Sequence, residues 1–377
     1  MFKRSLRFIF GELDGALLTI AFLLVSTGLV VLYSAAYDTP GRFQDQLRNI
    51  VVAVLIMWIA ARISPQTLMR IAVPVYAIGV GLLVAVFLFG VTKKGATRWL
   101  NLGVTVIQPS EIMKIAMPLM IAWYFHRHEA LVRLRDYLAA AVLLLVPVLL
   151  IAKQPDLGTA ILVLAAGMYV IFFAGLSWKL IIPVLAAALV AIGGLVYFED
   201  RACQPEVSWP GLKDYQKHRI CTLLDPSTDP LGKGFHTIQS TIAVGSGGIT
   251  GKGWLKGTQT HLEFIPERHT DFIFAVYAEE FGLIGNIALL LLYSWLIFRG
   301  FMIAANAPTF FSRLLAGAIT MIFFTYAFVN MGMVSGILPV VGVPLPLVSY
   351  GGTALVTLFL GIGILMSIQR HRKLVQT

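Results

Sequence analysis

The first long apolar run of the chain is Leu13-Asp-Gly-Ala-Leu-Leu-Thr-Ile-Ala-Phe-Leu-Leu-Val-Ser-Thr-Gly-Leu-Val-Val-Leu-Tyr-Ser-Ala-Ala36. A helix needs about 20 mainly apolar residues to cross a bilayer, and this run supplies them. The apolar region of a cleaved signal peptide is shorter, at about 7–15 residues. We therefore expect the run to form a retained transmembrane helix.

Runs of the same kind recur to the end of the chain. Of its 377 residues, 58% are hydrophobic and 13% are charged, whereas soluble proteins carry about 25% charged residues. The mean hydropathy is +0.82. The pattern predicts an all-α polytopic membrane protein, with residues 1–377 in one membrane domain. About ten spans are expected near 13–36, 46–62, 67–90, 108–126, 137–152, 157–175, 178–197, 271–298, 312–336 and 350–368.

The distribution of positive charge predicts the orientation. An even number of spans leaves both termini on one side, where the flanks carry 14 Lys and Arg residues against 6 in the short loops opposite. Because cytoplasmic loops are enriched in Lys and Arg, we predict cytoplasmic termini and a large extracytoplasmic loop at 198–270 between spans seven and eight. Such charges also contact anionic membrane lipids, so the net charge of +10 does not indicate a nucleic-acid partner.

The large loop contains both cysteines and a glycine-rich segment. Cys203 and Cys221 would lie in an oxidising compartment, where a disulfide and two separate thiols are about equally expected. The segment Gly245-Ser-Gly-Gly-Ile-Thr-Gly-Lys-Gly253 lacks the Gly-Lys-Ser/Thr of a nucleotide-binding loop, which favours tight turns at the membrane surface.

Ionisable residues concentrate where the loop meets the eighth span. Glu263, Glu267, Arg268, His269 and Asp271 precede a long apolar run that also contains Glu279 and Glu280. Charges near a bilayer core are costly, so such a cluster predicts a functional site. Asp271 is expected about 12 Å outside the hydrocarbon boundary, at headgroup height. The alternative is an acid that caps the helix, which would not account for its charged neighbours.

Two further groups of polar residues lie at predicted helix starts. Glu111 and Lys114 are three residues apart on one helix face, which fits either a self-neutralising pair or a cation ready to meet a pyrophosphate. Asp156 follows Gln-Pro in a short loop and fits a helix cap. Arg98 and Trp99 suit either phosphate and sugar binding or anchoring at the membrane interface.

The last span begins irregularly, with Pro344-Leu-Pro-Leu-Val-Ser-Tyr-Gly-Gly-Thr353. Irregular backbone at membrane depth normally lines a cavity, so Ser349 and Tyr350 are candidate site residues.

These motifs together resemble the SEDS family (shape, elongation, division, sporulation). The resemblance rests on Pro266-Glu-Arg-His-Thr-Asp-Phe272, Gln108-Pro-Ser-Glu-Ile-Met-Lys114, Gln154-Pro-Asp-Leu-Gly-Thr159 and Pro346-Leu-Val-Ser-Tyr-Gly-Gly-Thr353, and it covers essentially the whole chain. Tyr215-Gln-Lys-His-Arg-Ile220 and Gly251-Lys-Gly-Trp-Leu-Lys-Gly-Thr-Gln259 look more like the elongation member of the family than the division member.

The resemblance implies an inverting glycosyltransferase that polymerises lipid II on the outer face of the bacterial cytoplasmic (inner) membrane, for cell elongation and rod shape. Asp271 matches the essential residue of the family and would act as general base. The expected substrate-binding residues are Lys114, Glu111, Arg98, Trp99, Asp156, His269, Ser349 and Tyr350.

The expected partners are lipid II, the nascent lipid-linked glycan, a class B penicillin-binding protein and the rest of the elongation machinery. No metal site is predicted from ligand spacing, although Mg²⁺ or Mn²⁺ held by outer carboxylates is an open alternative. Two other functions also remain open at this point: a flippase that moves lipid II across the bilayer, and a scaffold that only activates the penicillin-binding protein.

Overall fold

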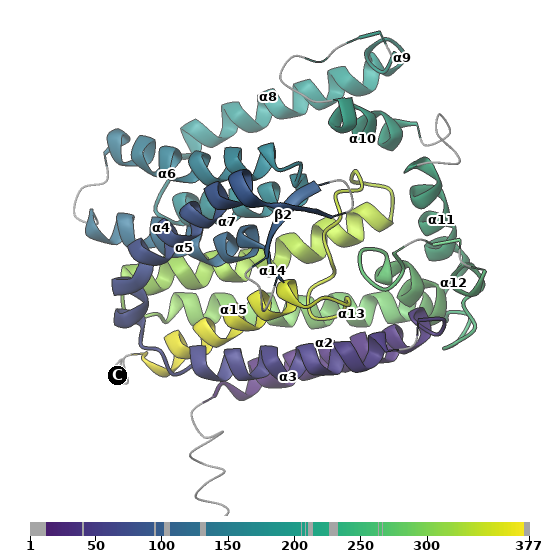
Figure 1. Ribbon diagram of the computed structural model, residues 1–377, viewed down its shortest axis with the longest axis horizontal. Helices are drawn as coiled ribbons and strands as arrows, with labels where there is room; N and C mark the ends of the chain where they lie inside the picture. Colours follow the sequence, from purple (N-terminus) through teal and green to yellow (C-terminus); the bar gives the residue numbers. More distant parts are fainter. Residues whose placement is uncertain are drawn as a thin grey trace, which may run out of the picture.

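The structure, a computed structural model, describes residues 13–39, 41–93, 96–101, 106–128, 133–204, 206–207, 209, 214–225, 233–262, 264–265 and 267–372. Glu263, one of the predicted cluster residues, lies outside these ranges. Long helices occupy all the ranges predicted as spans (Figure 1). They are α2 (Gly15–Ala35), α3 (Arg42–Ala60), α4 (Pro65–Phe89), α5 (Pro109–Arg127), α6 (Leu134–Lys153), α7 (Leu157–Phe173), α8 (Trp178–Tyr197), α13 (Ile273–Ala305), α14 (Phe310–Val334) and α15 (Thr353–Arg370).

The prediction of a helical, polytopic membrane protein is confirmed. In the described part of the chain, eight of these helices are long and apolar enough to cross a membrane by length and composition. The two others are α7, which has 17 residues, and α5, which carries Glu111 and Lys114. The count of ten spans therefore stays a prediction.

Several helices begin after a capping side chain of a type that is common at helix starts. Asp14, Ser64 and Thr309 each accept a hydrogen bond from the backbone N–H three residues further on. Such bonds pair N–H groups that the first turn of a helix leaves without partners.

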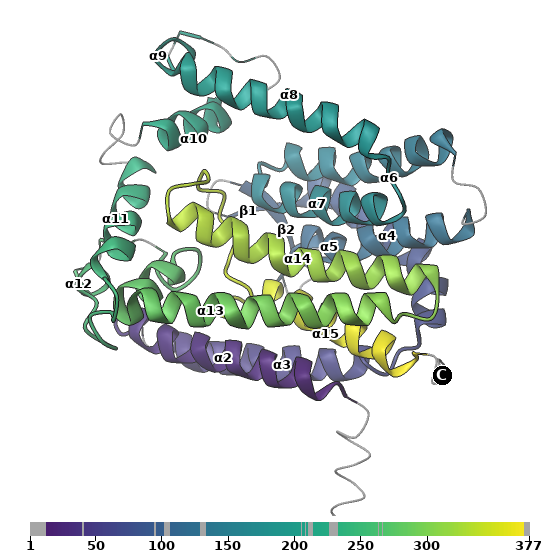
Figure 2. The ribbon, with the colours of Figure 1, turned by 180° about the vertical axis from the view of Figure 1, so that it is seen from behind.

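The centre of the bundle is α14, which packs against α5, α7 and α13. Tyr326 and Phe323 of α14 are among its fully buried large side chains. By contrast, α8 lies along one edge of the molecule (Figures 1 and 2), and every one of its residues is at least partly exposed.

A small antiparallel sheet connects α4 to α5, in strand order β1 (Val91–Lys93), β2 (Ala96–Asn101) and β3 (Val106–Ile107). The hydropathy pattern does not predict it, because β1 and β3 have only three and two residues and the six residues of β2, Ala-Thr-Arg-Trp-Leu-Asn, do not alternate between apolar and polar. β-Branched residues such as Val91, Thr92 and Thr97 favour the extended backbone there. The sheet positions Arg98 and Trp99 at the end of the bundle where α5 begins.

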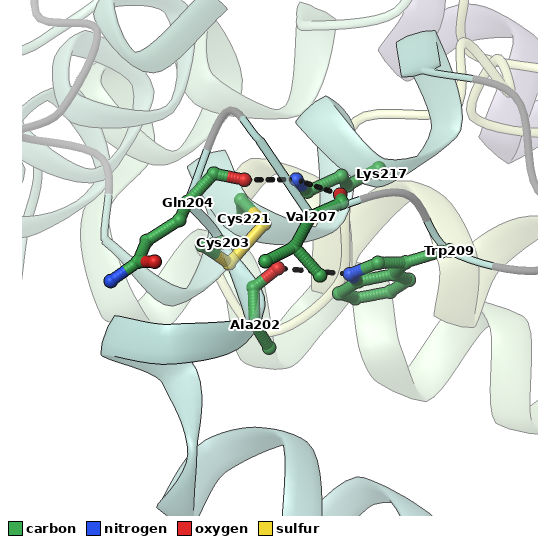
Figure 3. The surroundings of a disulfide bond; sticks show 7 residues. All are labelled: Ala202, Cys203, Gln204, Val207, Trp209, Lys217 and Cys221. Carbon is green, nitrogen blue, oxygen red and sulfur yellow. Dashed lines mark hydrogen bonds between the residues drawn. A yellow bond between two sulfur atoms is a disulfide. The ribbon is translucent and has the colours of Figure 1, made fainter.

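The segment between α8 and α13 contains α9 (Glu199–Ala202), α10 (Asp214–Leu224), α11 (Lys233–Ser246) and α12 (Thr258–His261). A disulfide joins Cys203 to Cys221 and so links α9 to α10 (Figure 3). The Lys217 ammonium group donates to the carbonyl of Val207 at 2.6 Å, and the Trp209 indole donates to that of Ala202 at 2.9 Å.

Candidate active site

Asp271 lies in the turn that leads into α13. The helix begins at Ile273, its N-cap is Phe272, and no side chain accepts a capping bond there. The N-cap position, which was the structural alternative to a functional role for Asp271, therefore belongs to Phe272. The residue is half-buried at the rim of the bundle.

The backbone of this turn is fixed by α14. The Asn330 side-chain amide, which is fully buried, donates to the carbonyl oxygens of Asp271 and Val343, each at 2.7 Å. One amide thus joins the Asp271 turn to the irregular segment that follows α14. An amide with two backbone acceptors has little freedom to rotate, so the position of Asp271 depends on α14.

The irregular segment 335–352, between α14 and α15, holds the same turn from another side. Ser349 donates from Oγ to the carbonyl of Thr270 at 2.6 Å and accepts from the N–H of Leu345 at 2.8 Å. The N–H of Tyr350 donates to the carbonyl of His269 at 2.9 Å. Ser349 and Tyr350, both predicted site residues, therefore hold the backbone next to Asp271.

Gly342 brings this segment against the Asp271 carboxylate. Its φ is +73°, a conformation that residues with a Cβ rarely adopt. A Cβ at this position would lie 3.3 Å from Oδ2 of Asp271. Glycine at this position therefore lets the backbone of the segment approach the Asp271 carboxylate without displacing it.

The first turns of α3 complete this side of the site. The Arg42 guanidinium hydrogen-bonds Nε2 of His269 and lies 5.5 Å from the centre of the Tyr350 ring. Gln46 bonds both the carbonyl of Ser349 and the N–H of Gly351. Arg42 therefore places a positive charge beside the turn that carries Asp271.

Arg268, the residue before His269, has a structural role. It is 6% exposed, and it donates to the carbonyls of Ala35 and Thr260 at 2.8 and 3.1 Å. It also pairs with Asp38 at 2.6 Å. Burial raises the pKa of Asp38, but the hydrogen bond and charge of Arg268 outweigh it and hold that pKa below its usual value. This pair ties the loop to the end of α2.

The two acids inside α13 are also structural. Glu279 is fully buried and accepts bonds from the Lys252 ammonium at 2.7 Å and from the Thr258 hydroxyl and Gln259 N–H at 3.0 Å each. Glu280 accepts a bond from the Ser34 hydroxyl of α2. The glycine-rich segment thus folds around these acids, as turns rather than as a phosphate-binding loop.

Lys114 and Glu111 form a buried ion pair on α5. The Lys114 ammonium lies 2.6 Å from Oε1 of Glu111 and also hydrogen-bonds the hydroxyl of Tyr326 on α14. Within the described residues, Oε2 of Glu111 has no hydrogen-bond partner. The Lys114 side chain is 3% exposed, so the self-neutralising pair is present, and contact of Lys114 with a pyrophosphate stays a prediction.

Asp156 lies at the start of α7, close to β2. It caps the helix by accepting from the N–H of Thr159 at 3.3 Å, and it accepts from the Gln108 amide at 2.9 Å. The Arg98 guanidinium lies 3.6 Å from the same carboxylate and its side chain is 32% exposed. Arg98, with half-buried Trp99 beside it, is therefore more accessible than Lys114.

The Lys114 group and the Asp271 turn both contact α14. Tyr326 and Asn330 are four residues apart, which places them on one face of α14, one turn from each other. A Cβ on Gly158 would lie 2.7 Å from the carbonyl oxygen of Val341, so the segment around Gly342 also packs on the start of α7. The structure thus brings the Lys114, Asp156 and Asp271 groups to the same end of the bundle.

The sequence pattern did not indicate Arg42, Tyr326 or Asn330. Arg42 precedes the second apolar run and was counted only as a loop charge. The sequence did contain a signal for Asn330, because a buried Asn in an apolar helix needs a hydrogen-bond partner. In the described part of the chain, no group of three or more His, Cys, Asp and Glu residues is placed to hold a metal ion.

Comparison with known proteins agrees with this architecture. Residues 15–374 match the sequence model of the FtsW, RodA and SpoVE family, described as cell cycle proteins. The chain is 51% identical over 365 residues to the peptidoglycan glycosyltransferase MrdB of Escherichia coli K12, and the match covers 96% of this chain and 95% of that protein. It is 30% identical to the peptidoglycan glycosyltransferase RodA of Treponema pallidum, over 96% and 98% of the two chains.

Solved structures give the same picture. A chain from a peptidoglycan synthase complex, studied for the coordination of polymerization and crosslinking, has a TM-score of 0.78 and 34% identity, over 96% of this chain and 99% of that one. The rod shape determining protein RodA of Thermus thermophilus has a TM-score of 0.70 and 28% identity, over 96% and 97%.

Proposed function

We propose that this chain, which belongs to the FtsW, RodA and SpoVE family and is a peptidoglycan glycosyltransferase, polymerises lipid II with the Asp271 carboxylate as general base. The observation that carries the proposal is the placement of Asp271. Its backbone neighbours are held by Asn330, Ser349 and Tyr350. The N-cap residue of α13 is Phe272 rather than Asp271.

In the proposed reaction, the 4-hydroxyl oxygen of a GlcNAc attacks the anomeric carbon of a lipid-linked MurNAc. The new C–O bond forms as the bond to the pyrophosphate oxygen breaks, and undecaprenyl pyrophosphate leaves with the bonding electron pair. The hydroxyl proton passes to Asp271. One in-line displacement converts an α linkage into a β linkage and requires no covalent sugar–enzyme intermediate. A carboxyl group with an ordinary pKa near 4 is ionised at neutral pH and is suited to this role.

The departing pyrophosphate needs positive charge rather than a proton. Arg98 is the better placed of the two predicted cations, because one third of its side chain is exposed and Asp156 orients it. Lys114 would reach the pyrophosphate only after a separation of α5 from α14, since Glu111 and Tyr326 now occupy its ammonium group. A bound divalent cation is a further proposal, which chelation tests.

The proposed setting is the inner membrane, with both termini cytoplasmic and Asp271 extracytoplasmic. A class B penicillin-binding protein is the proposed partner, which would crosslink the new strand, and the related synthase complex supports this choice. The exposed helix α8 and the described helices of the following segment, α9 to α12, offer surface for such contacts.

A flippase and a scaffold remain the competing functions. The charged groups described above gather at one end of the bundle rather than at its midplane, which favours an enzyme over a translocation path.

Polymerisation of lipid II by the purified chain and its partner in detergent micelles tests the proposal, because micelles offer no second compartment. Glycan polymer on a gel is expected in buffer. Loss of polymer on adding a chelator, with recovery on Mg²⁺ or Mn²⁺, would establish the cation. An absence of polymer under all these conditions would contradict the proposal and favour the flippase.

A further inference from the structure

A cavity lined by two arginines lies far from Asp271. It has a volume of about 520 Å³ and is lined by residues of α4 and α5, namely Met69, Arg70, Val73, Trp123, His126 and Arg127. These residues belong to the first turns of α4 and the last turns of α5. The cavity is therefore at the end of the bundle opposite the candidate active site, and the reaction proposed above does not use it.

Two of the lining residues bring uncompensated positive charge. Within the residues that the structure describes, neither Arg70 nor Arg127 forms an ion pair with a carboxylate. Both side chains are exposed. Two guanidinium groups that share one cavity and lack an acid partner are suited to a phosphate group.

Trp123 contacts the guanidinium group of Arg127. The Arg127 guanidinium lies over the Trp123 ring, 5.4 Å from its centre. A guanidinium stacked in this way keeps its N–H donors at its edges, where they can still bond an oxyanion. The half-buried Trp123 is also the kind of side chain that occupies the boundary between hydrocarbon and headgroups.

Apart from the two arginines, Trp123 and half-buried His126, the lining is apolar. Val73 is 38% exposed on α4, one turn from half-buried Met69. Both lie further along α4 toward the bilayer than its first turn, so they offer a surface for an acyl chain. A free phosphate ion would use only the arginines, whereas a phospholipid would use both parts of the cavity.

We propose that this cavity binds an anionic phospholipid, whose phosphate contacts Arg70 and Arg127 and whose acyl chain lies along Met69 and Val73. Basic pockets between transmembrane helices bind anionic headgroups in this way. The inference requires only that α4 and α5 span a membrane. It does not depend on the proposed function.

Lipid titration of the delipidated, full-length protein in detergent tests this proposal. Phosphatidylglycerol should raise the thermal unfolding midpoint, while equal concentrations of phosphatidylcholine or inorganic phosphate should not. Arg70→Gln and Arg127→Gln should each weaken the apparent affinity for phosphatidylglycerol about fivefold. One basic residue near an anionic lipid strengthens binding by about this factor.

Arg313→Gln is the matched control. Arg313 is an exposed arginine in the first turn of α14, at the same end of the bundle but outside the cavity. The variant should bind phosphatidylglycerol as the wild type does. Equal weakening in all three variants would reduce the effect to general charge attraction and overturn the proposal. If inorganic phosphate raised the unfolding midpoint as much as phosphatidylglycerol does, the lipid assignment would be overturned.

Discussion

Asn330 of α14 lies 2.7 Å from the backbone carbonyl oxygen of Asp271 and holds the turn that presents the proposed general base. Its second bond, to Val343, fixes the segment that faces the same carboxylate. The proposed catalytic geometry thus depends on a buried residue of α14.

Asn330→Ala should lower kcat for polymerisation by about tenfold or more, with a smaller change in KM, because Asp271 loses its positional restraint. It should also destabilise the protein by about 1–3 kcal/mol, since two carbonyls lose a partner. Asn306→Ala is the control, because within the described residues that amide bonds only the carbonyl of Met302, at the opposite end of the bundle. Equal loss of activity in both variants would remove Asn330 from this role.

Gly342→Ala should abolish most of the activity. The added Cβ would lie 3.3 Å from the Asp271 carboxylate at a φ of +73°. Gly175→Ala is the control that separates backbone strain from displacement of the carboxylate. Gly175 has a φ of +101°, but no atom lies within 4 Å of the added Cβ. Both variants should lose about 1 kcal/mol of stability, and only Gly342→Ala should lose activity in the gel assay.

Lys114→Met should destabilise the protein by about 3–5 kcal/mol, because Glu111 would remain charged and buried without its partner. Glu111→Leu combined with Lys114→Met should restore most of this stability, as measured by thermal unfolding. The double variant also decides the role of Lys114. A folded but inactive protein would indicate pyrophosphate binding, whereas wild-type polymerisation would leave the pair as purely structural.

Acid should weaken the contact between Asp38 and Arg268. The pKa of Asp38 is lower in the folded protein than its usual value. The carboxylate therefore contributes stability above its unfolded pKa of about 3.9, and this contribution is lost as the pH falls through the folded value. Thermal unfolding of Asp38→Asn against wild type should show a gap at pH 7 that closes below about pH 4. A gap unchanged down to pH 2 would contradict the pairing.

Much of this fold follows from hydropathy alone. Runs of about 20 apolar residues can satisfy their backbone in lipid only as helices, so their positions in the sequence predict α2 to α8 and α13 to α15 closely. The strands between α4 and α5 were not predicted, because β1 and β3 are too short to display a period and the six residues of β2 do not alternate between apolar and polar.

The site was predictable only in part. Costly charges marked Asp271, Glu111, Lys114 and Asp156, and the structure places all four at one end of the bundle. Sequence position did not separate Asp271 from Arg268 or Glu279, because that distinction depends on partners distant in the chain, such as Asp38 and Lys252. Asn330 was missed for the same reason.

The Asp271 carboxylate is proposed to accept the proton of the attacking sugar hydroxyl. Asp271→Asn keeps the shape and removes the base, and Glu267→Gln removes a neighbouring exposed carboxylate of the same turn. In the lipid II assay with the penicillin-binding protein, Asp271→Asn should lower the polymerisation rate at least about 100-fold while the complex still assembles. Glu267→Gln should stay within about threefold of wild type. Polymerisation by Asp271→Asn at the wild-type rate would contradict the account.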